Sequence, residues 1–393
     1  MDGRVAFWCR GLDLGGKEVE DLLRGVLRGA VSRWPAGMDA SQVEAFIDVA
    51  RRHGVQGVLH ERLQPHREGD WPAALVHGLR RDALREAAAE MLRQQAVAEV
   101  LAALAAVDIE PVLFKGTALA YSLYPDPALR PRCDTDLIVP LQQRQRALDA
   151  LGEIGFSRVL ELGGAMSHQA CLTRSGVGAH TLDLHWHINN SELLARLFSY
   201  EDLRAGARRL PRLAPHALGA CPMHALLIAC MHRASHRQPP ALVDGTPQFG
   251  SDRLIWLYDI HLLVEVLRPV EWDEFLGLAE RRGFRAVCLE ALEQARTAFG
   301  SPVPDRVLER LSRPGAPEPT ALYLQAGPVR RRWLEFQARE GLRGKLRFAR
   351  ELALPPAIYM REFYPNARMN WLPWLYLRRA FSKLCPRCTG ARG

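Results

Sequence analysis

The stretch from Pro111 to Pro140 limits the possible folds of this chain more than any other part of it. A short apolar run (residues 112–114) leads into a Lys-Gly-Thr turn (115–117), and the residues after the turn favour a helix. Beyond a bend rich in proline and arginine, an Asp-Thr-Asp sequence (134–136) stands at the head of a second apolar run. The stretch therefore predicts a strand, a turn that opens a helix, and a second strand that begins with acidic residues.

The two acidic residues predict a metal site. Alternate side chains of a strand share a face, so Asp134 and Asp136 point the same way. Two carboxylates held this close repel each other unless a cation lies between them, and carboxylate oxygens are the ligands that Mg²⁺ prefers.

The turn before the helix predicts a phosphate site. A glycine beside a polar residue at a helix start leaves backbone N–H groups free to bind an anion, which suggests Gly116 and Thr117. Lysine is rare here, with four lysines among 52 basic residues, so Lys115 is a candidate phosphate contact. A solvated position at the helix start is the alternative for Lys115.

Arg130 and Arg132 stand just before the acidic pair and allow two interpretations. They could neutralise Asp126 or cap the bend, or they could contact a triphosphate, because a planar guanidinium suits phosphate oxygens. We include both among the candidate nucleotide-binding residues.

A third carboxylate lies in the segment 180–188, which alternates between apolar and polar residues as a half-buried strand does. If this strand lies beside the one that begins at Asp134, Asp183 joins the first two carboxylates. Three acidic groups can hold two Mg²⁺ ions. His185 and His187 share the face of Asp183, so they could support the site or act as a base, although a structural role is the simpler interpretation.

Length and composition set broader limits. A chain of 393 residues predicts two or three structural units, and its 48% hydrophobic content is ample for a core. No apolar run has the length of a membrane span, and the first residues lack the pattern of a secretory signal. The eight cysteines are scattered rather than arranged as a disulfide framework, so a cytoplasmic location is expected.

The net charge is concentrated in the C-terminal segment. Residues 330–393 contain 15 basic and 4 acidic residues and carry +11, whereas the whole chain carries +8. The preceding residues are therefore slightly acidic. The basic, aromatic segment could lie on a membrane surface or a nucleic acid, or pack on the body, which we favour for residues 371–376.

The pattern along the chain is that of an α+β protein with four parts. We expect an N-terminal helical region (1–107), a core of mixed strands and helices (108–204), a helical substrate- or nucleotide-binding domain (205–319) and a basic aromatic tail (320–393). Segments 205–222 and 301–319, rich in proline, are interpreted as linkers.

Several weaker patterns have structural explanations as the first choice. His224, His232 and His236 fall on one side of a helix and are expected to line a core or a groove. A transition-metal site at the histidines of segment 180–188 lacks supporting ligand spacing. Asp259 follows Trp256 by one helical turn, so helix packing is preferred over contact with a base. The cysteines of 385–388 have zinc spacing but no second pair.

The segments 115–139 (KGTALAYSLYPDPALRPRCDTDLIV) and 182–186 (LDLHW) together resemble a family of uncharacterised bacterial nucleotidyltransferases in the DNA polymerase β-like superfamily. Segments 226–232 and 256–260 are similar to the helical region of that family. The resemblance extends from about residue 79 to 299. It implies a mixed sheet flanked by helices and a two-metal transfer of a nucleotidyl group from an NTP.

The resemblance also implies roles for single residues. Asp134 and Asp136 match the metal-binding pair, Asp183 the third carboxylate, and Gly116 and Thr117 the phosphate-binding turn. Threonine replaces the serine usual in the superfamily and keeps the hydroxyl. The gap between turn and acidic pair is longer than in the superfamily at large, although it fits this family.

We therefore expect a Mg²⁺-dependent nucleotidyltransferase that moves an NMP group, with ATP as the favoured donor, to a hydroxyl or phosphate of a small molecule or peptide. The occurrence of family members near natural-product and surface-polysaccharide genes implies such acceptors. One alternative is a non-catalytic nucleotide-binding or regulatory protein, as in a toxin–antitoxin pair. Another is a nucleotidyltransferase that acts on RNA ends, although a nucleic-acid partner is not favoured.

Overall fold

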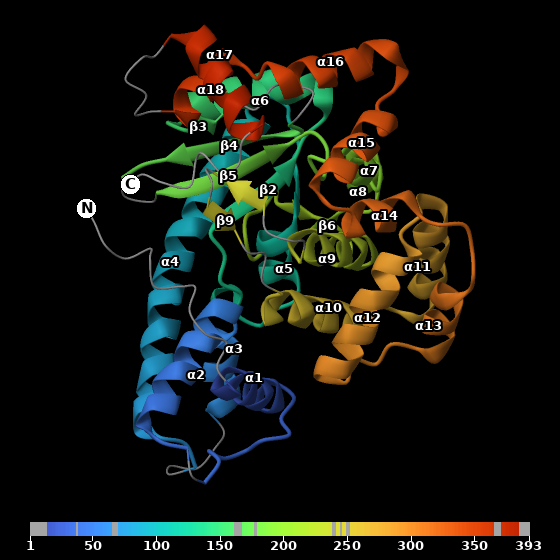
Figure 1. The fold of residues 1–393 in the computed structure, drawn as a ribbon. Helices are drawn as coiled ribbons and strands as arrows, with labels where there is room; N and C mark the ends of the chain where they lie inside the picture. The colour runs from blue at the N-terminus through green and yellow to red at the C-terminus, as the bar shows by residue number, and fades with distance from the viewer. Residues whose placement is uncertain are drawn as a thin grey trace.

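The computed structural model of the protein describes residues 14–36, 38–64, 70–160, 167–176, 179–237, 241–243, 246–248, 252–364 and 371–384. At its centre is a mixed sheet with strand order β3-β4-β5-β2-β1-β7-β6, surrounded by helices (Figure 1). The expected α+β class, with a mixed sheet and flanking helical regions, is confirmed. The strands of the sheet are β1 (Val112–Phe114), β2 (Asp134–Ile138), β3 (Ser157–Leu160), β4 (Gln169–Arg174), β5 (His180–His185), β6 (Arg208–Arg209) and β7 (Leu218–Gly219).

The N-terminal part is helical, as predicted, and the long helix α4 connects it to the sheet (Figure 1). The second helix begins at a capping box, in which the Asp39 side chain accepts from the backbone of Gln42, and it ends at Gly54 in the left-handed conformation. The helices of this part are α1 (Leu14–Leu27), α2 (Ala40–His53), α3 (Gln56–Leu63) and α4 (Ala73–Ala105).

Further helices lie within and beside the core. Gly283 separates two of them, because this glycine has φ 66° and ends one helix just before the next begins. These helices are α5 (Lys115–Ser122), α6 (Arg144–Glu153), α7 (Glu192–Ala195), α8 (Tyr200–Ala205), α9 (Pro222–His236), α10 (Leu254–Val266), α11 (Pro269–Arg282), α12 (Arg285–Phe299) and α13 (Asp305–Ser312), with short 3₁₀ turns at Pro127–Leu129 and Leu141–Gln143. A two-stranded hairpin, β8 (Ala241–Val243) and β9 (Thr246–Gln248), lies between α9 and α10.

The described part of the C-terminal segment forms five helices, of which the last three lie at the end of the molecule opposite α1–α3 (Figure 1). Leu375 is fully buried and the Tyr376 hydroxyl donates to the carbonyl of Pro355 at 2.5 Å, so part of the segment 371–376 packs inward. The two tryptophans of that segment, Trp371 and Trp374, are exposed. The helices are α14 (Pro319–Gln325), α15 (Pro328–Ala338), α16 (Gly341–Ala353), α17 (Ala357–Phe363) and α18 (Leu372–Leu384). Cys385 and Cys388 lie outside the described residues.

The interpretation of two segments as linkers is wrong. Within 205–222, β7 pairs with β1 in parallel and β6 pairs with β7, so this segment extends the sheet. Within 301–319, residues Asp305–Ser312 form α13, whose Val307 and Leu311 are buried in the helical core. The many prolines of these segments resemble linker composition, whereas the short elements within them gain their stability from tertiary packing.

The two faces of the central strands have different surroundings, because side chains alternate along a strand. Leu113, Leu137 and Leu184 belong to one buried cluster, which also contains residues of α4 and α6. Phe114 and Ile138 point to the other face and join the larger cluster formed by the N-terminal helices and α9–α12. The acidic side chains of β2 share this second face, on the side of the sheet where α5 and α9 lie.

A buried ion pair connects the sheet segment to the helical part. Arg130 donates from Nη2 to Asp259 Oδ2 at 2.7 Å, and both side chains are almost completely buried. The Tyr124 hydroxyl donates to Asp259 Oδ1, also at 2.7 Å. Asp259 therefore satisfies two buried donors from the segment that carries the acidic pair, which agrees with the preferred packing role of this residue.

We expect Asp259→Ala to lower the free energy of unfolding by about 3–5 kcal/mol, because it leaves the Arg130 guanidinium buried without a counter-charge. Urea unfolding followed by fluorescence measures this loss. Asp273→Ala serves as the control, since its 2.8 Å pair with Arg306 is exposed and its removal should change stability by less than about 1 kcal/mol. Equal losses for the two variants would contradict the structural role of the Arg130–Asp259 pair.

Candidate functional site

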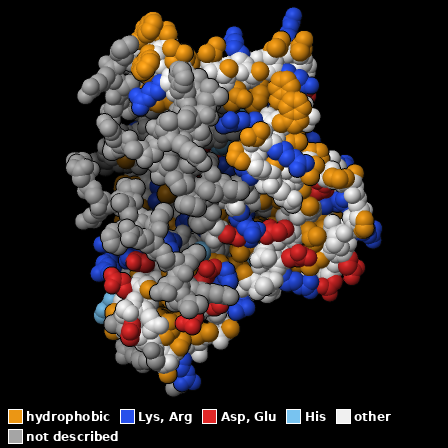
Figure 2. Space-filling model, viewed as in Figure 1, with side chains coloured by type: hydrophobic (Ala, Val, Ile, Leu, Met, Phe, Trp, Pro, Cys, Tyr) orange, Lys and Arg blue, Asp and Glu red, His pale blue; other side chains and the backbone are white. Residues whose placement is uncertain are grey.

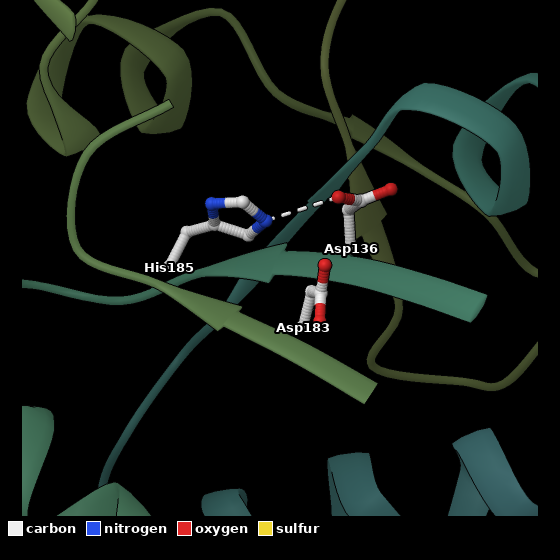
Figure 3. Close-up of side chains that lie close together, drawn as sticks. All are labelled: Asp136, Asp183 and His185. Atoms are coloured by element: carbon white, nitrogen blue, oxygen red, sulfur yellow. Dashed lines mark hydrogen bonds and ion pairs between the residues drawn. The ribbon is translucent and has the colours of Figure 1, made fainter. Parts of the chain in front are cut away.

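Two carboxylates face each other across neighbouring parallel strands. The pairing of β2 with β5 places Asp136 directly beside Asp183, on the same face of the sheet (Figure 3). Asp136 is only 5% exposed, whereas Asp183 is half-buried. The predicted neighbourhood of these strands is thus confirmed. The local cause is the alternation of segment 180–188, which puts Leu182 and Leu184 into the core and leaves Asp183 on the opposite face.

His185 completes a compact group with the two carboxylates. Its Nε2 donates to Asp136 Oδ1 at 3.0 Å (Figure 3). The His185 ring packs edge-on against Phe114. Potential ligand atoms of Asp136, Asp183 and His185 all lie within 4.8 Å of one another. Burial, together with the charge of Lys115, lowers the pKa of His185, so its ring is neutral at pH 7. A neutral imidazole and two carboxylates are a donor set that fits a divalent cation.

Lys115 contributes the positive charge beside Asp136. Its Nζ donates to Asp136 Oδ1 at 2.5 Å. The residue has φ 56°, in the left-handed region that residues other than glycine rarely adopt, at the junction of β1 and α5. Although burial opposes ionisation, Lys115 and then His185 hold the pKa of Asp136 below its usual range. Asp136 is therefore ionised throughout the physiological pH range.

Asp134 lies on the same face of β2 at the edge of this group. Burial and the charges of Asp136 and Asp183 raise the pKa of Asp134 to about 6. The charges of both other carboxylates therefore act on Asp134, although the compact group of ligand atoms described above does not include this residue. Its role as a metal ligand stays a prediction.

Strand β4, which pairs with β5, places beside Asp183 two side chains that the sequence did not single out. Gln169 donates from Nε2 to Asp183 Oδ2 at 2.8 Å. Cys171 lies directly opposite Asp183 in the antiparallel pairing. Burial and the charge of Asp183 raise the pKa of the Cys171 thiol to about 12, so it is a neutral neighbour. Only the register of β4 against β5 identifies these residues, because nothing in their own spacing marks them.

The turn residues Gly116 and Thr117 have different surroundings. Thr117 is completely buried, its hydroxyl lies 2.9 Å from that of Thr135, and it accepts from Arg132 Nε at 3.1 Å. Gly116 lies close to two arginines, since a Cβ at this position would approach Arg130 Nη1 to 3.2 Å. Phosphate binding by this turn stays a prediction, and the Thr117 hydroxyl already has protein partners.

Both candidate arginines are buried in ion pairs. Arg130 binds Asp259, as described above, and Arg132 Nη2 donates to Glu90 Oε1 of α4 at 2.6 Å. The Tyr121 hydroxyl donates to the same carboxylate oxygen at 2.7 Å. The structure therefore uses both guanidinium groups to hold the turn and β2 against neighbouring helices. Contact of either arginine with a nucleotide stays a prediction.

A small pocket opens beside Lys115, between α5, α9 and α10. It is lined by Lys115, Leu119, Arg130, Ala225, Ile228, Ala229, His232, Trp256 and Asp259. The rings of His232, His236 and Trp256 contact one another, with centroid distances of 4.4, 5.3 and 5.0 Å. The predicted groove-lining position of His232 is confirmed.

Two other candidate histidines lie away from this pocket. His224 is buried elsewhere against Phe198, with ring centroids 4.5 Å apart, and His187 packs against His168.

The opposite face of β2 is held by a buried histidine. His180 Nε2 lies 3.1 Å from the hydroxyl of Thr135, the residue between the two aspartates. Burial, and then the charge of Arg132, lower the pKa of His180 to about 4. His180 is therefore neutral and supports the strand from behind the carboxylates.

We expect the free energy of unfolding to fall by about 1–2 kcal/mol through His180 as the pH is lowered from about 7 to about 5. The unfolded chain takes up a proton near pH 6.5 whereas the folded chain does not, so lower pH favours unfolding. His180→Gln should flatten this part of the pH profile of urea unfolding. The exposed His216 provides the control, since His216→Gln should keep the wild-type slope. An unchanged slope for His180→Gln would contradict the buried neutral state.

Comparison with known protein families identifies the family to which this chain belongs. The sequence profile of a family described as uncharacterised nucleotidyltransferase matches residues 39–300, which is well over half of the chain. The chain therefore belongs to this family, and the expectation of a nucleotidyltransferase is confirmed. A comparison with curated proteins found no match.

Proposed function

We propose that this member of the nucleotidyltransferase family transfers an NMP group from an NTP, with ATP as the first donor to test, to a hydroxyl or phosphate of a small molecule or peptide, and releases pyrophosphate. The family implies the NTP substrate. The observation that carries the proposal is the group of Asp136, Asp183 and His185, whose ligand atoms lie within 4.8 Å of one another. Acceptors connected with natural-product biosynthesis are the first class to test.

The residues of the group fit a divalent cation. Asp136 is ionised, His185 is neutral, and Asp183 lies beside both, so three donors converge from two strands. The Nε2 atom of His185, which faces Asp136, would exchange its hydrogen bond with that carboxylate for the ion (Figure 3). Asp134 adds a further carboxylate at the edge, and together these groups would hold Mg²⁺. When bound, such an ion neutralises phosphate charge and lowers the pKa of a coordinated acceptor oxygen.

The protein's own residues position the reactants. Lys115 brings a compact ammonium to the junction of β1 and α5, within side-chain reach of a phosphate at the helix start. Gly116 has no side chain there, so its backbone N–H can approach a phosphate closely. Asp183, the more accessible of the paired carboxylates, would orient the acceptor oxygen.

The reaction needs little covalent participation by the protein. The acceptor oxygen forms a bond to the α-phosphorus, and the bond from that phosphorus to the bridging oxygen breaks. The electron pair leaves with pyrophosphate, and a hydroxyl acceptor releases its proton to water. Correct positioning and neutralisation of the phosphate charge would provide most of the rate enhancement. The buried pairs of Arg130 and Arg132 keep the turn and β2 rigid while the substrates bind.

The donor can be tested by thermal unfolding with each of the four NTPs, in the presence and absence of Mg²⁺. We expect one NTP to raise the midpoint by at least about 3 °C when Mg²⁺ is present, because a ligand that binds only the folded state stabilises it. Asp134→Ala/Asp136→Ala should abolish this shift. Asp149→Ala, which removes an exposed carboxylate of α6, should preserve it. An equal shift without the metal would favour a non-catalytic nucleotide-binding protein.

Catalysis can be tested with α-labelled NTP and a fraction of cellular small molecules as the source of acceptors. Wild-type protein should transfer label to a small molecule and release pyrophosphate. Asp136→Ala should lower the rate by about a hundredfold or more, since charge stabilisation in the transition state is lost. Asp149→Ala again serves as the control. Transfer that survives Asp136→Ala would refute the proposed site, and transfer to RNA ends instead would identify the alternative acceptor class.

A further inference from the structure

The C-terminal helices present apolar side chains to solvent beside an excess of basic ones. Leu342 is 73% exposed, Leu346 60% and Trp333 57%. The segment 330–393 carries a net charge of +11. Figure 2 shows hydrophobic and basic side chains intermixed over the end of the molecule where these helices lie. Apolar side chains gathered on one surface usually mark a contact with a partner or a membrane.

Helix α16 shows the arrangement most clearly. Its exposed apolar residues follow a spacing of four, three and four, which places them in one stripe along the helix: Leu342, Leu346, Ala349 and Ala353. Exposed arginines stand on one flank of this stripe, at positions 343, 347 and 350. Phe348 and Glu351 form the opposite, buried side. The helix therefore has one face toward the body and a second apolar face toward solvent.

The neighbouring helices repeat this pattern with aromatic residues. Val329 and Trp333 are exposed one turn apart on α15. The exposed Arg330 and Arg332 stand between them in the chain. At α18, exposed Trp371, Trp374 and Leu377 recur every three residues, with exposed Arg378 beside them. Tryptophan and arginine are suited to the boundary between lipid headgroups and acyl chains.

The inner side of these helices is attached to the body, so the exposed stripe has a defined direction. Arg339 Nη1 donates to Glu192 of α7 at 2.6 Å, and the Arg339 guanidinium lies over the Phe348 ring. The backbone N–H of Glu192 donates to Glu335 of α15 at 3.1 Å. Arg196 donates to the carbonyl of Ala338 at 2.7 Å. These contacts hold α15 against the core while its outer residues stay in solvent.

We propose that α15, α16 and α18 form a docking surface for an anionic lipid bilayer, with the leucines and tryptophans in the interfacial layer and the arginines on the phosphates. The charge is complementary to acidic lipids, and the alternation of arginine with exposed leucine and tryptophan is that of helices which lie in the membrane plane. A nucleic acid would match the arginines but would leave the leucines in water.

The geometry requires no membrane-spanning element. Among the described residues, no helix combines the length and the apolar character that crossing a bilayer would take. The binding is therefore peripheral, and the first test is whether the full chain moves with lipid vesicles.

The experiment compares flotation with vesicles rich in phosphatidylglycerol and with vesicles of phosphatidylcholine alone. We expect the wild-type chain to float with the anionic vesicles and not with the neutral ones, and binding to weaken as salt is raised from about 0.05 to about 0.5 M. Leu342→Glu/Leu346→Glu should lower the partition coefficient by about tenfold or more, since it removes apolar contact and adds repulsion.

A matched control uses two exposed valines away from this surface. Val266→Glu/Val270→Glu adds the same charges at the junction of α10 and α11 and should leave vesicle binding at the wild-type level. Unchanged circular dichroism of both variants confirms that they are folded. Absence of binding to anionic vesicles, or equal binding of the two double variants, would overturn the proposal. Salt-sensitive binding to RNA that is indifferent to Leu342→Glu/Leu346→Glu would overturn it in favour of a nucleic-acid surface.

Discussion

The site depends on the parallel pairing of β2 with β5, which places the carboxylates of Asp136 and Asp183 side by side. Neighbouring strands lie about 4.8 Å apart, so two like charges at this distance repel each other strongly where they are partly removed from water. The protein offsets this repulsion locally, with Lys115 and His185 on Asp136 and Gln169 on Asp183. Burial, and then the repulsion from Asp136 and Asp183, raise the pKa of the edge carboxylate Asp134. A cluster of this kind destabilises the fold unless it serves a ligand, which is why a cation site is its natural explanation.

The reverse face of the same strand explains how the protein tolerates this cluster. Thr135 lies between the two aspartates of β2 and points away from them, toward Thr117 and His180. Arg132 links this network to Glu90 of the long helix α4. Among the described residues, the buried side-chain atoms of this network do not lack hydrogen-bond partners. Its burial therefore costs little free energy, and the network is rigid. The residues that the motif suggests for nucleotide binding thus divide into two sets. Lys115 contacts the carboxylate of Asp136, whereas the side chains of Thr117, Arg130 and Arg132 hold the scaffold.

The helical parts complete the site from two directions. Helices α9 and α10 supply His232, Trp256 and Asp259 to the pocket beside Lys115, and the Arg130–Asp259 pair fixes α10 to the segment that carries the acidic residues. On another side, the contacts of Glu192 with α15 fasten the C-terminal helices to the core. The strands of the candidate site and the basic outer surface therefore belong to one packed body. A bilayer contact at that surface would hold the site close to acceptors that are themselves located at membranes.

The sequence alone determined the α+β class, the two acidic strands and the shared face of Asp134 and Asp136, because strand periodicity and turn composition are local properties. It also determined the helical ends of the chain. Only the tertiary structure decided which strands are neighbours, and with them the membership of His185, Gln169 and Cys171 in the site. The same holds for β6 and β7, whose proline-rich surroundings resemble a linker until β1 pairs with them. Strand register and the choice between a free and a buried arginine depend on residues far apart in the chain, which no local pattern records.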